Sequence, residues 1–441
     1  MKNIEKDGDD MDFPAWYDGK TINETLFCEE FLAEHPMVSV NDTFFTKSGR
    51  ITDENWLKKE IYDRIKPHVT GGIARKIIGI LDVLRVECYC PGLPLYQDRI
   101  HVANGTLFLD GRFSEHKDFC RNRLPVAYNI NAPQPVKWLH FLSQLLEPED
   151  IPTLQEFMGY CLIPSTKGQK MLILTGKGGE GKSRIGLVLR ALLGSNMNTG
   201  SIAKIETSPF ARADLEHQLV MLDDDMKLEA LPQTNNIKAI VTAELPMDLE
   251  KKGRQSYQGD LYVRFLALGN GTLQSLYDRS VGFFRRQIIL TVKEKDPNRR
   301  DDPYLAEKLC AEAEGIFLWA LEGLNRLIAN DYRFTISAAA HENMTAAVSE
   351  GNNIVEFLNS EGYIRFKADY EASSRDLYSV YRLWCDDNAV SALSAKSFCS
   401  YLKQNERTYN LEYPNKVHVG NGRFVRGFMG IEILHRDYEI L

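Results

Sequence analysis

The spacing of apolar and charged residues predicts a first region in which helices accompany a small sheet. Apolar side chains recur at helical intervals in five segments, residues 24–34, 53–68, 71–87, 136–147 and 150–161. Within residues 99–113 the pattern changes to two β-rich runs that flank Asn104-Gly105, a dipeptide typical of tight hairpin turns. A Pro-rich stretch at 125–135 predicts an extended connector between this hairpin and the last two helices.

A different alternation begins near residue 170. Short apolar strands alternate with helices up to residue 293, which is the pattern of an α/β core, and a helical segment follows over about 303–330. The polar, Ala- and Asn-rich residues 331–353 predict a linker. Beyond it the pattern predicts a strand, two helices and two further strands, at residues 362–367, 375–387, 394–405, 415–419 and 423–434.

The composition is that of an ordinary soluble protein, with 441 residues of which 44% are hydrophobic and 26% charged. No apolar run reaches the roughly 18 residues needed to span a bilayer, and the acidic N-terminus lacks the apolar core of a secretory signal. The eight cysteines include no CxxC pair, which favours free thiols in a reducing compartment. We therefore expect a cytoplasmic protein that does not associate with membranes. Its net charge of −8 means that any polyanion must be bound by a local basic patch.

The strongest chemical signal is the segment 176–183, Gly-Lys-Gly-Gly-Glu-Gly-Lys-Ser, which fits the phosphate-binding pattern G-x-x-x-x-G-K-[ST]. An apolar strand over 171–174 leads into it and a helix over 184–193 leaves it. The glycines let backbone N–H groups face a phosphate, Lys182 reaches the β- and γ-phosphates, and the Ser183 hydroxyl ligates Mg²⁺. The predicted nucleotide contacts are Gly176, Gly178, Gly179, Glu180, Gly181, Lys182, Ser183 and Arg184. The alternative is a Gly-rich turn that binds nothing.

Polar residues at the ends of two later strands fit the other parts of a nucleotide-hydrolysing centre. The apolar run 219–222 leads into Asp223, the expected second Mg²⁺ ligand, and Asp224, the candidate for polarising the attacking water. A plain acidic strand end is the alternative. Asn270 follows another apolar strand and is suited to hydrogen-bond the γ-phosphate or that water, although Asn-Gly is also a common turn pair.

Basic residues gather before, within and after the second of these strands. Between residues 251 and 286, seven lysines and arginines stand against two aspartates, a local excess within an acidic chain. Arg285 and Arg286 precede an apolar strand. An arginine there stabilises the charge that develops in phosphoryl transfer, or else pairs with a surface acid.

Three further segments combine with these motifs into a specific pattern. They are the hairpin Ile100–Leu109, the step Leu124–Tyr128 with Ala132, and the neck Leu154–Tyr160. From about residue 95 to its end, the chain resembles a superfamily 3 helicase, a P-loop motor of the AAA+ type. In particular it resembles the helicase half of phage-satellite and poxvirus-type primase–helicases. The segment before the resemblance leaves no room for a typical primase module, so we expect a helicase without its own primase.

The resemblance implies a role for each matching residue. The matches are Gly181, Lys182 and Ser183 in the first motif, Asp223 and Asp224 in the second, the sensor Asn270, and Arg286 with Arg285 beside it. One arginine of this pair is expected to reach the nucleotide of a neighbouring subunit. The family also carries a β-hairpin that grips single-stranded DNA, here within 237–257, and Lys251, Lys252 and Arg254 at its tip are the predicted DNA contacts. The chain departs from the family at Glu180, where many relatives have Asn, and at Ala243-Glu244 before the hairpin.

The C-terminal residues 354–441 predict two helices followed by a basic hairpin, an arrangement that fits a winged helix. Lys396 and Lys403 would face a DNA duplex, with Arg423 on the wing. The alternative is a module that docks a protein. The aromatic residues of its helices, Tyr378, Tyr381, Trp384 and Phe398, are expected in its core.

The predicted fold is therefore multidomain α/β. It comprises an acidic tail (1–25), a small α+β N-terminal domain with a helical neck (26–165), an AAA+-type P-loop NTPase core (166–335) and a winged-helix domain (354–441). The implied function is that of an ATP- and Mg²⁺-dependent, ring-forming DNA helicase that replicates a phage, plasmid or integrated mobile element. Its expected partners are single-stranded and forked DNA, further copies of itself in a homo-hexamer, and a separate primase or initiator protein.

Other functions remain open at this point. One is a DNA-binding P-loop ATPase that acts in replication initiation, or in regulation or interference by the element, without processive unwinding. A P-loop kinase or transferase would need a small acceptor substrate and no basic hairpin. A scaffold with a degenerate nucleotide site would tolerate loss of Lys182.

Overall fold

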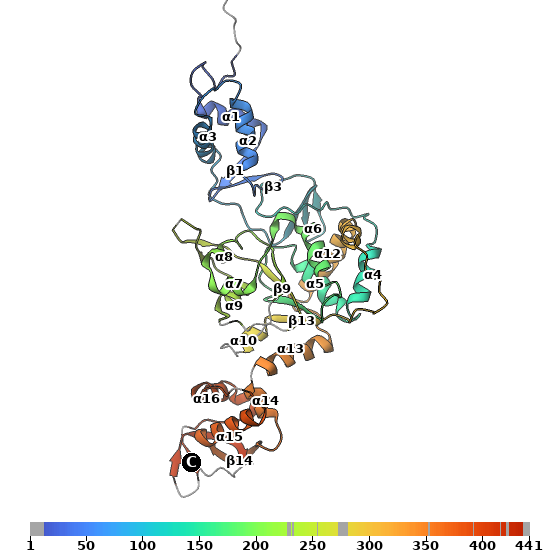
Figure 1. The fold of residues 1–441 in the computed structure, drawn as a ribbon, viewed down its shortest axis with the longest axis vertical. Helices are drawn as coiled ribbons and strands as arrows, with labels where there is room; N and C mark the ends of the chain where they lie inside the picture. Colours follow the sequence, from blue (N-terminus) through green and yellow to red (C-terminus); the bar gives the residue numbers. More distant parts are fainter. Residues whose placement is uncertain are drawn as a thin grey trace, which may run out of the picture. The chain divides into compact units, whose positions relative to one another are not determined.

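The computed structural model describes most of the chain. The described residues are 13–226, 231, 233–253, 255–271, 281–351, 353–390, 392–414, 416–419 and 423–434. The chain divides into two compact units, one made of residues 1–227, 235–271 and 288–337 and the other of 228–234, 272–287 and 338–441. Figure 1 shows the fold and labels some of the helices and strands of each unit.

A five-stranded sheet forms the centre of the first unit. Its strands lie in the order β13-β7-β12-β9-β8, with the bounds Gln287–Thr291, Met171–Thr175, Arg264–Gly269, Val220–Met226 and Met197–Thr199. The pairings of β7 with β12, β12 with β9 and β9 with β8 are parallel. Because β12 lies between β7 and β9, the carboxyl ends of these strands meet at one edge, where open α/β sheets bind ligands. The sheet confirms the predicted α/β core of the P-loop NTPase kind.

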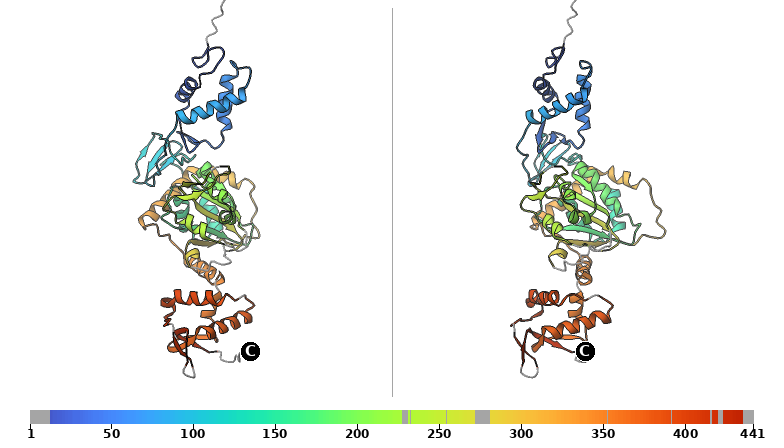
Figure 2. Two further views of the ribbon diagram at one scale, coloured as in Figure 1. Left: turned by 90° about the vertical axis from the view of Figure 1, so that its left-hand side faces the viewer. Right: turned by 60° about the vertical axis from the view of Figure 1, so that its left-hand side comes forward.

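Five helices of the first unit pack with the sheet or with one another. They are α4 (Val136–Leu145), α5 (Ile151–Tyr160), α6 (Ser183–Leu193), α11 (Leu305–Cys310) and α12 (Ala313–Ala329). The core is seen from two further sides in Figure 2. A Cβ atom on Gly159 of α5 would lie 2.2 Å from the carbonyl oxygen of Ala320 in α12, so only glycine allows this approach. The helical segment predicted over about 303–330 consists of two helices, α11 and α12.

Short elements precede and follow β8 and β9 in the chain. They are the 3₁₀ turn η1 (Gly194–Asn196) and the helices α7 (Ile202–Thr207), α8 (Pro209–Ala213) and α9 (Asn235–Val241). After α9, strands β10 (Met247–Leu249) and β11 (Tyr257–Gly259) form an antiparallel hairpin with Leu249 opposite Tyr257. A β-hairpin therefore lies where the resemblance implied one.

The first part of the chain is helical, as its apolar periodicity predicted. Helices α1 (Glu24–Glu34), α2 (Asn55–Ile65) and α3 (Ile73–Glu87) enclose a core of their own, which includes Phe27, Leu57 and Leu84. Residues 13–23 were expected to belong to an acidic tail, but they pack against this core. The reason is Trp16, whose buried ring meets the ring of Phe27 edge to face, with centroids 5.1 Å apart.

Two small antiparallel sheets lie on either side of α2 and α3 in the chain, one before them and one after them. The sheet β1-β2-β3 (Met37–Val40, Thr43–Thr46 and Gly49–Arg50) was not predicted. The sheet β4-β5-β6 (Arg99–Val102, Gly105–Phe108 and Phe113–Ser114) contains the expected hairpin, with Val102 opposite Gly105. A Cβ atom on Gly105 would lie 2.1 Å from the carbonyl oxygen of Ser114 in β6, which explains the glycine at the start of β5.

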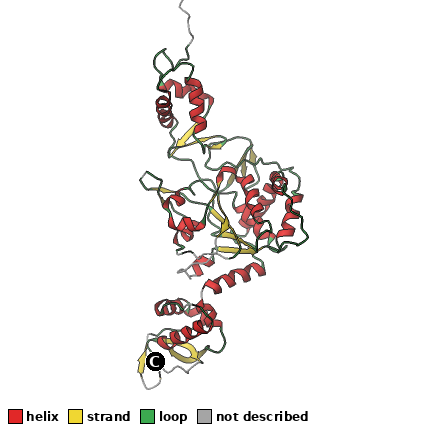
Figure 3. Cartoon of the chain, viewed as in Figure 1, coloured by secondary structure: helices red, strands yellow, loops and turns green. Residues whose placement is uncertain are grey.

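The second unit combines helices with two-stranded sheets, which Figure 3 distinguishes by colour. Its helices are α10 (Val281–Phe284), α13 (Ala338–Gly351), α14 (Asn353–Asn359), α15 (Ser374–Asp387), α16 (Ala395–Gln404) and α17 (Glu406–Tyr409). Its strands are β14 (Ile364–Ser373), β15 (Val417–Val419), β16 (Arg423–Val425) and β17 (Gly427–Ile433), paired as β14-β17 and β15-β16. Tyr381, Trp384 and Phe398 are buried in its core, as predicted.

One expectation for this unit was wrong. Residues 338–351, predicted to lie in a linker, form α13. The run of alanines in that segment explains the difference, because alanine has the highest helix propensity of all residues. Within the described residues no helix is both long and apolar enough to cross a membrane. All eight cysteines are free thiols, as expected.

Candidate functional site

The phosphate-binding motif forms the connection between β7 and α6. Three glycines of the loop have positive φ angles, 107° at Gly178, 83° at Gly179 and 111° at Gly181. Residues with a Cβ rarely adopt this conformation, so the sequence pattern and the backbone agree. The described part of the chain offers no hydrogen-bond partner to the N–H groups of residues 181–183, which stand at the N-terminal end of α6. Such amides, together with the helix dipole, suit an anion.

The loop already holds one anionic group of its own. The carboxylate of Glu180 accepts the N–H of Gly178 at 2.7 Å and the ammonium of Lys182 at 2.8 Å. Both side chains of this pair are buried, with exposed fractions of 3% for Glu180 and 9% for Lys182. Burial alone would raise the pKa of Glu180, but the hydrogen bonds from Lys182 and the loop backbone hold it below its usual value. The carboxylate thus engages two groups that the motif assigns to phosphate, which shows that the loop fits an anion.

Arg299 is a part of this site that the sequence motifs did not reveal. Its guanidinium donates to the carbonyl oxygens of Glu180 at 2.7 Å and Gly179 at 2.9 Å. It therefore fixes the outer side of the loop and adds a positive charge beside it. Nothing in the spacing could have found Arg299, because it lies far along the chain from the loop that it contacts.

Asp223 and Asp224 lie within β9, which the sequence predicted to end before them but which continues to Met226. Asp223 is buried and accepts the N–H of Ile202 at 2.8 Å, whereas Asp224 is exposed. Burial raises the pKa of Asp223 above its usual value, against that hydrogen bond. A cation beside it would stabilise its charged form, and Mg²⁺ at this carboxylate stays a prediction. No group of three or more His, Cys, Asp or Glu side chains placed to hold a metal was found among the described residues.

Asn270 follows β12, the strand between the P-loop strand and the acidic strand. The loop and the end of β12 are joined by a hydrogen bond of 3.2 Å from the N–H of Gly176 to the carbonyl of Gly269. A Cβ atom on Gly178 would lie 4.0 Å from the Oδ1 atom of Asn270, so the exposed amide stands beside the loop. The fold thus brings the loop and the predicted sensor amide together.

The two arginines predicted to act on a neighbouring subunit lie between α10 and β13. Arg285 is exposed and Arg286 is half-buried. Arg286 donates to the carbonyl of Gly282 within its own turn. Their role across a subunit boundary stays a prediction.

The predicted DNA contacts of the hairpin differ in how free their charges are. Lys252 is exposed, Lys251 donates to the carboxylate of Glu216 at 2.8 Å, and Arg254 lies outside the described residues. Arg264, which contributed to the basic excess of the sequence, is buried and donates to the carbonyl oxygens of Tyr262 and Ile163 at 2.5 Å. Part of the local charge is therefore structural.

In the second unit the basic candidates lie on α16 and β16. Lys396 and Lys403 are both exposed. The ammonium of Lys403 lies 3.6 Å from the centroid of the Tyr413 ring, a favourable cation–π contact. Arg423 begins β16, the first described strand after the predicted wing turn. Whether these residues contact DNA stays a prediction.

Comparisons with known proteins support this view of the fold. Residues 174–286 match DUF5906, described as a family of unknown function. An apo structure of the NrS-1 C-terminal region has a TM-score of 0.54 and 11% identity, and the match covers 93% of this chain and 100% of that one. The A form of that region gives 0.50 and 12%, over 91% of this chain and 98% of that one.

The chain has the fold of these NrS-1 regions. The resemblance found in the sequence is therefore confirmed at the level of fold. At identities this low the likeness establishes the fold alone, and the activity must be argued from the residues. The JCV helicase matches 52% of this chain with a TM-score of 0.29, which is too low to carry an argument.

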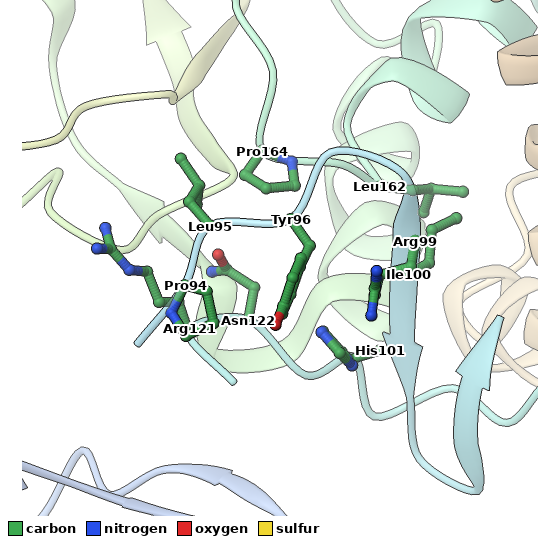
Figure 4. Close-up of a pocket in the computed structure, with 10 residues that line it drawn as sticks. All are labelled: Pro94, Leu95, Tyr96, Arg99, Ile100, His101, Arg121, Asn122, Leu162 and Pro164. Atoms are coloured by element: carbon green, nitrogen blue, oxygen red, sulfur yellow. The ribbon is translucent and has the colours of Figure 1, made fainter. Parts of the chain in front are cut away.

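A small hollow elsewhere in the first unit is a different kind of feature. Figure 4 shows its lining, which includes Tyr96, His101 and Arg121. Its volume of about 20 Å³ suits a water molecule and excludes a nucleotide. His101 is buried, and its Nε2 atom has no partner among the described residues. Burial lowers its pKa to about 4, so the neutral ring would be satisfied by such a water.

Proposed function

We propose that this chain is an ATP-dependent motor that acts on single-stranded DNA, a ring-forming helicase of a phage, plasmid or integrated mobile element. One observation carries the proposal. The loop with Lys182 at its end lies at the edge of the sheet where β9 presents Asp223 and β12 presents Asn270. A lysine, two carboxylates and an amide at one sheet edge are the parts that hydrolysis of a nucleoside triphosphate needs.

The residues divide the chemistry among themselves. The amides of the loop and the Lys182 ammonium would bind the phosphates, once Lys182 leaves Glu180. Ser183 and Asp223 would hold Mg²⁺, which neutralises charge on the phosphates when bound. Asp224, exposed at the same strand end, would accept the proton of the attacking water, and Asn270 would orient that water.

An arginine from a second copy would complete the centre. In this proposal Arg286, with Arg285 beside it, reaches the nucleotide of the neighbouring protomer and stabilises the charge of the transferred phosphoryl group. This requires an assembly, and we propose a homo-hexamer. The proposed AAA+-type core would thus hydrolyse ATP only at the interface between two protomers.

The hairpin β10–β11 is the proposed grip on DNA. Lys252 is exposed at its tip, next to Gly253. In a ring, one such cation from each protomer would follow the phosphate backbone without regard to sequence. The second unit, with Lys396 and Lys403 exposed on α16, is the proposed winged helix that recognises a duplex or recruits a primase or initiator.

A second function has one observation in its favour. Lys251, one of the three predicted hairpin cations, is already neutralised by Glu216, which reduces the charge available for a strong grip. The chain would then be a DNA-binding ATPase of replication initiation or element regulation that does not unwind processively.

The test combines ATP hydrolysis, strand displacement and mass. We expect ATPase activity that rises with added single-stranded oligonucleotide, displacement of a strand from forked DNA, and a nucleotide-dependent assembly in native mass spectrometry. Lys182→Ala should abolish turnover. Lys177→Ala is the matched control, because this lysine belongs to the same loop but is exposed and paired with Glu294. Stimulated hydrolysis without displacement would favour the second function, and turnover indifferent to DNA would refute both.

A further inference from the structure

A buried carboxylate joins the two arms of the hairpin. One oxygen of Glu216 accepts a hydrogen bond from the ammonium of Lys251 at 2.8 Å and another from the hydroxyl of Tyr257 at 2.7 Å. Lys251 follows the end of β10, and Tyr257 begins β11. Glu216 therefore ties the arms together just below the tip that carries Lys252.

The contact is built closely around that carboxylate. A Cβ atom on Gly259 of β11 would lie 3.4 Å from the other oxygen of Glu216 and 2.5 Å from the side chain of Leu249. Glu216 itself is 7% exposed. Lys251 also lies over the Tyr257 ring, 4.9 Å from its centroid. The hairpin is thus seated on Glu216 by charge, hydrogen bonding and packing together.

The charges of this pair persist at ordinary pH. Burial would raise the pKa of Glu216, but the adjacent His217 ring and the hydrogen bonds from Lys251 and Tyr257 hold it below its usual value. Burial would lower the pKa of Lys251, yet the bond to Glu216 raises it. His217 lies 3.9 Å from Glu216, and burial lowers its pKa to about 4, so it is neutral near pH 7.

The backbone at Glu216 is fixed from the other side. His217 has a φ of 65°, a left-handed conformation that costs a non-glycine residue energy and persists only where surroundings impose it. Arg50 of β3 donates to the carbonyl oxygen of Glu216 at 3.4 Å and to that of Ser195 at 3.2 Å. Three residues after His217, the chain enters β9, which contains the catalytic candidate Asp223.

From this arrangement we infer that Glu216 is the positioning residue of the DNA-gripping hairpin, with Lys251 and Tyr257 as its anchors. Lys251 then serves to hold the hairpin, and Lys252 is the cation that meets DNA phosphates. Because Glu216 lies only a few residues before β9, the same segment joins the hairpin to the strand of the hydrolytic acids. The role in DNA binding rests on the proposed function. The contacts of Glu216 with Lys251 and Tyr257, called the clamp below, do not.

The sign of the effect separates positioning from simple electrostatics. Glu216→Gln removes a negative charge close to the proposed DNA path, which by itself would tighten DNA binding. Loss of positioning should instead lower the stimulation of ATPase by a single-stranded oligonucleotide about tenfold, which corresponds to the free energy of one hydrogen bond between charged groups. Basal turnover should stay within about twofold of the wild-type rate. Tyr257→Phe removes only the hydroxyl and should lower stimulation about threefold. Asp248→Asn, an exposed carboxylate on the same hairpin, is the matched control and should not lower it.

Salt dependence tests the two lysines separately. Lys252→Met should reduce the slope of log affinity against log salt by about 0.7, the value for one phosphate contact with a single strand. Lys251→Met should weaken binding but leave the slope unchanged. Its effect should also vanish in the Glu216→Gln background, because the two changes break one interaction. A reduced slope for Lys251→Met, or additive effects of the two changes, would overturn the inference.

Amide hydrogen exchange tests whether Glu216 positions the hairpin even if the wild-type protein does not bind DNA. Residues 247–259 should exchange faster in Glu216→Gln than in wild type or Asp248→Asn. If wild type binds no oligonucleotide but this difference is found, the proposed function fails and the clamp stands. If Glu216→Gln keeps both hairpin protection and DNA stimulation, the inference is wrong whatever the fate of the proposed function.

Discussion

Replacing Glu180 by glutamine should tighten ATP binding. In the structure Lys182 donates to the Glu180 carboxylate at 2.8 Å, and exposed fractions of 9% and 3% show that water does little to weaken the pair. A triphosphate must take Lys182 and the Gly178 amide from this carboxylate before the loop can bind it. Glutamine keeps the size of the side chain and an acceptor oxygen but removes its charge.

The magnitude follows from the interaction that is lost. A hydrogen bond to a charged group contributes about 1.5–3 kcal/mol, against about 0.5–1.5 kcal/mol for a neutral one. The difference of about 1 kcal/mol is the extra cost that ATP meets in the wild type, partly offset because the displaced carboxylate regains water. We expect the Kd for ATP to fall about fivefold in Glu180→Gln.

The assay is a titration of nucleotide followed by calorimetry or by the fluorescence of a labelled ATP analogue. It should be done without DNA at pH 7.5 and with Mg²⁺ present. Glu294→Gln is the matched control, because Glu294 pairs with the loop residue Lys177 in full exposure and should leave the Kd unchanged. An unchanged or higher Kd for Glu180→Gln would refute the view that its carboxylate competes with phosphate.

Three further expectations concern the same core. Arg299→Ala should raise the KM for ATP about tenfold, since two charge-assisted bonds to the loop carbonyls are lost, and exposed Arg300→Ala should not. Gly159→Ala should lower the free energy of unfolding, measured by urea titration, by about 3 kcal/mol or prevent folding. Gly79→Ala should raise it by about 0.5 kcal/mol, because no atom lies within 4 Å of the added methyl group. His217 binds a proton near pH 6.5 when unfolded but only near 4 when folded, so stability should fall as the pH drops from 6.5 to 4. His217→Gln should flatten that slope in urea titrations at several pH values, and an unaltered slope would contradict the pKa.

The elements were predictable wherever a signal lies within a few residues. The helix over 24–34 was found with its true bounds. The hairpin predicted around Asn104-Gly105 is present, but its turn is Ala103-Asn104 and Gly105 already belongs to β5. The P-loop was equally plain, because its glycines are needed for positive φ at fixed spacing. Residues 338–351 show the limit of such signals, since polar character suggested a linker and alanine content made a helix.

The sequence by itself determined the phosphate loop, the acids after one strand and the amide after another. Only the tertiary structure decided what touches them, because contacts between residues far apart in the chain depend on the order of strands in the sheet. Arg299 on the loop carbonyls and Glu216 beneath the hairpin leave no periodic trace. The burial of Arg264, and the capture of Lys182 by Glu180, likewise depend on the surroundings that the folded core supplies.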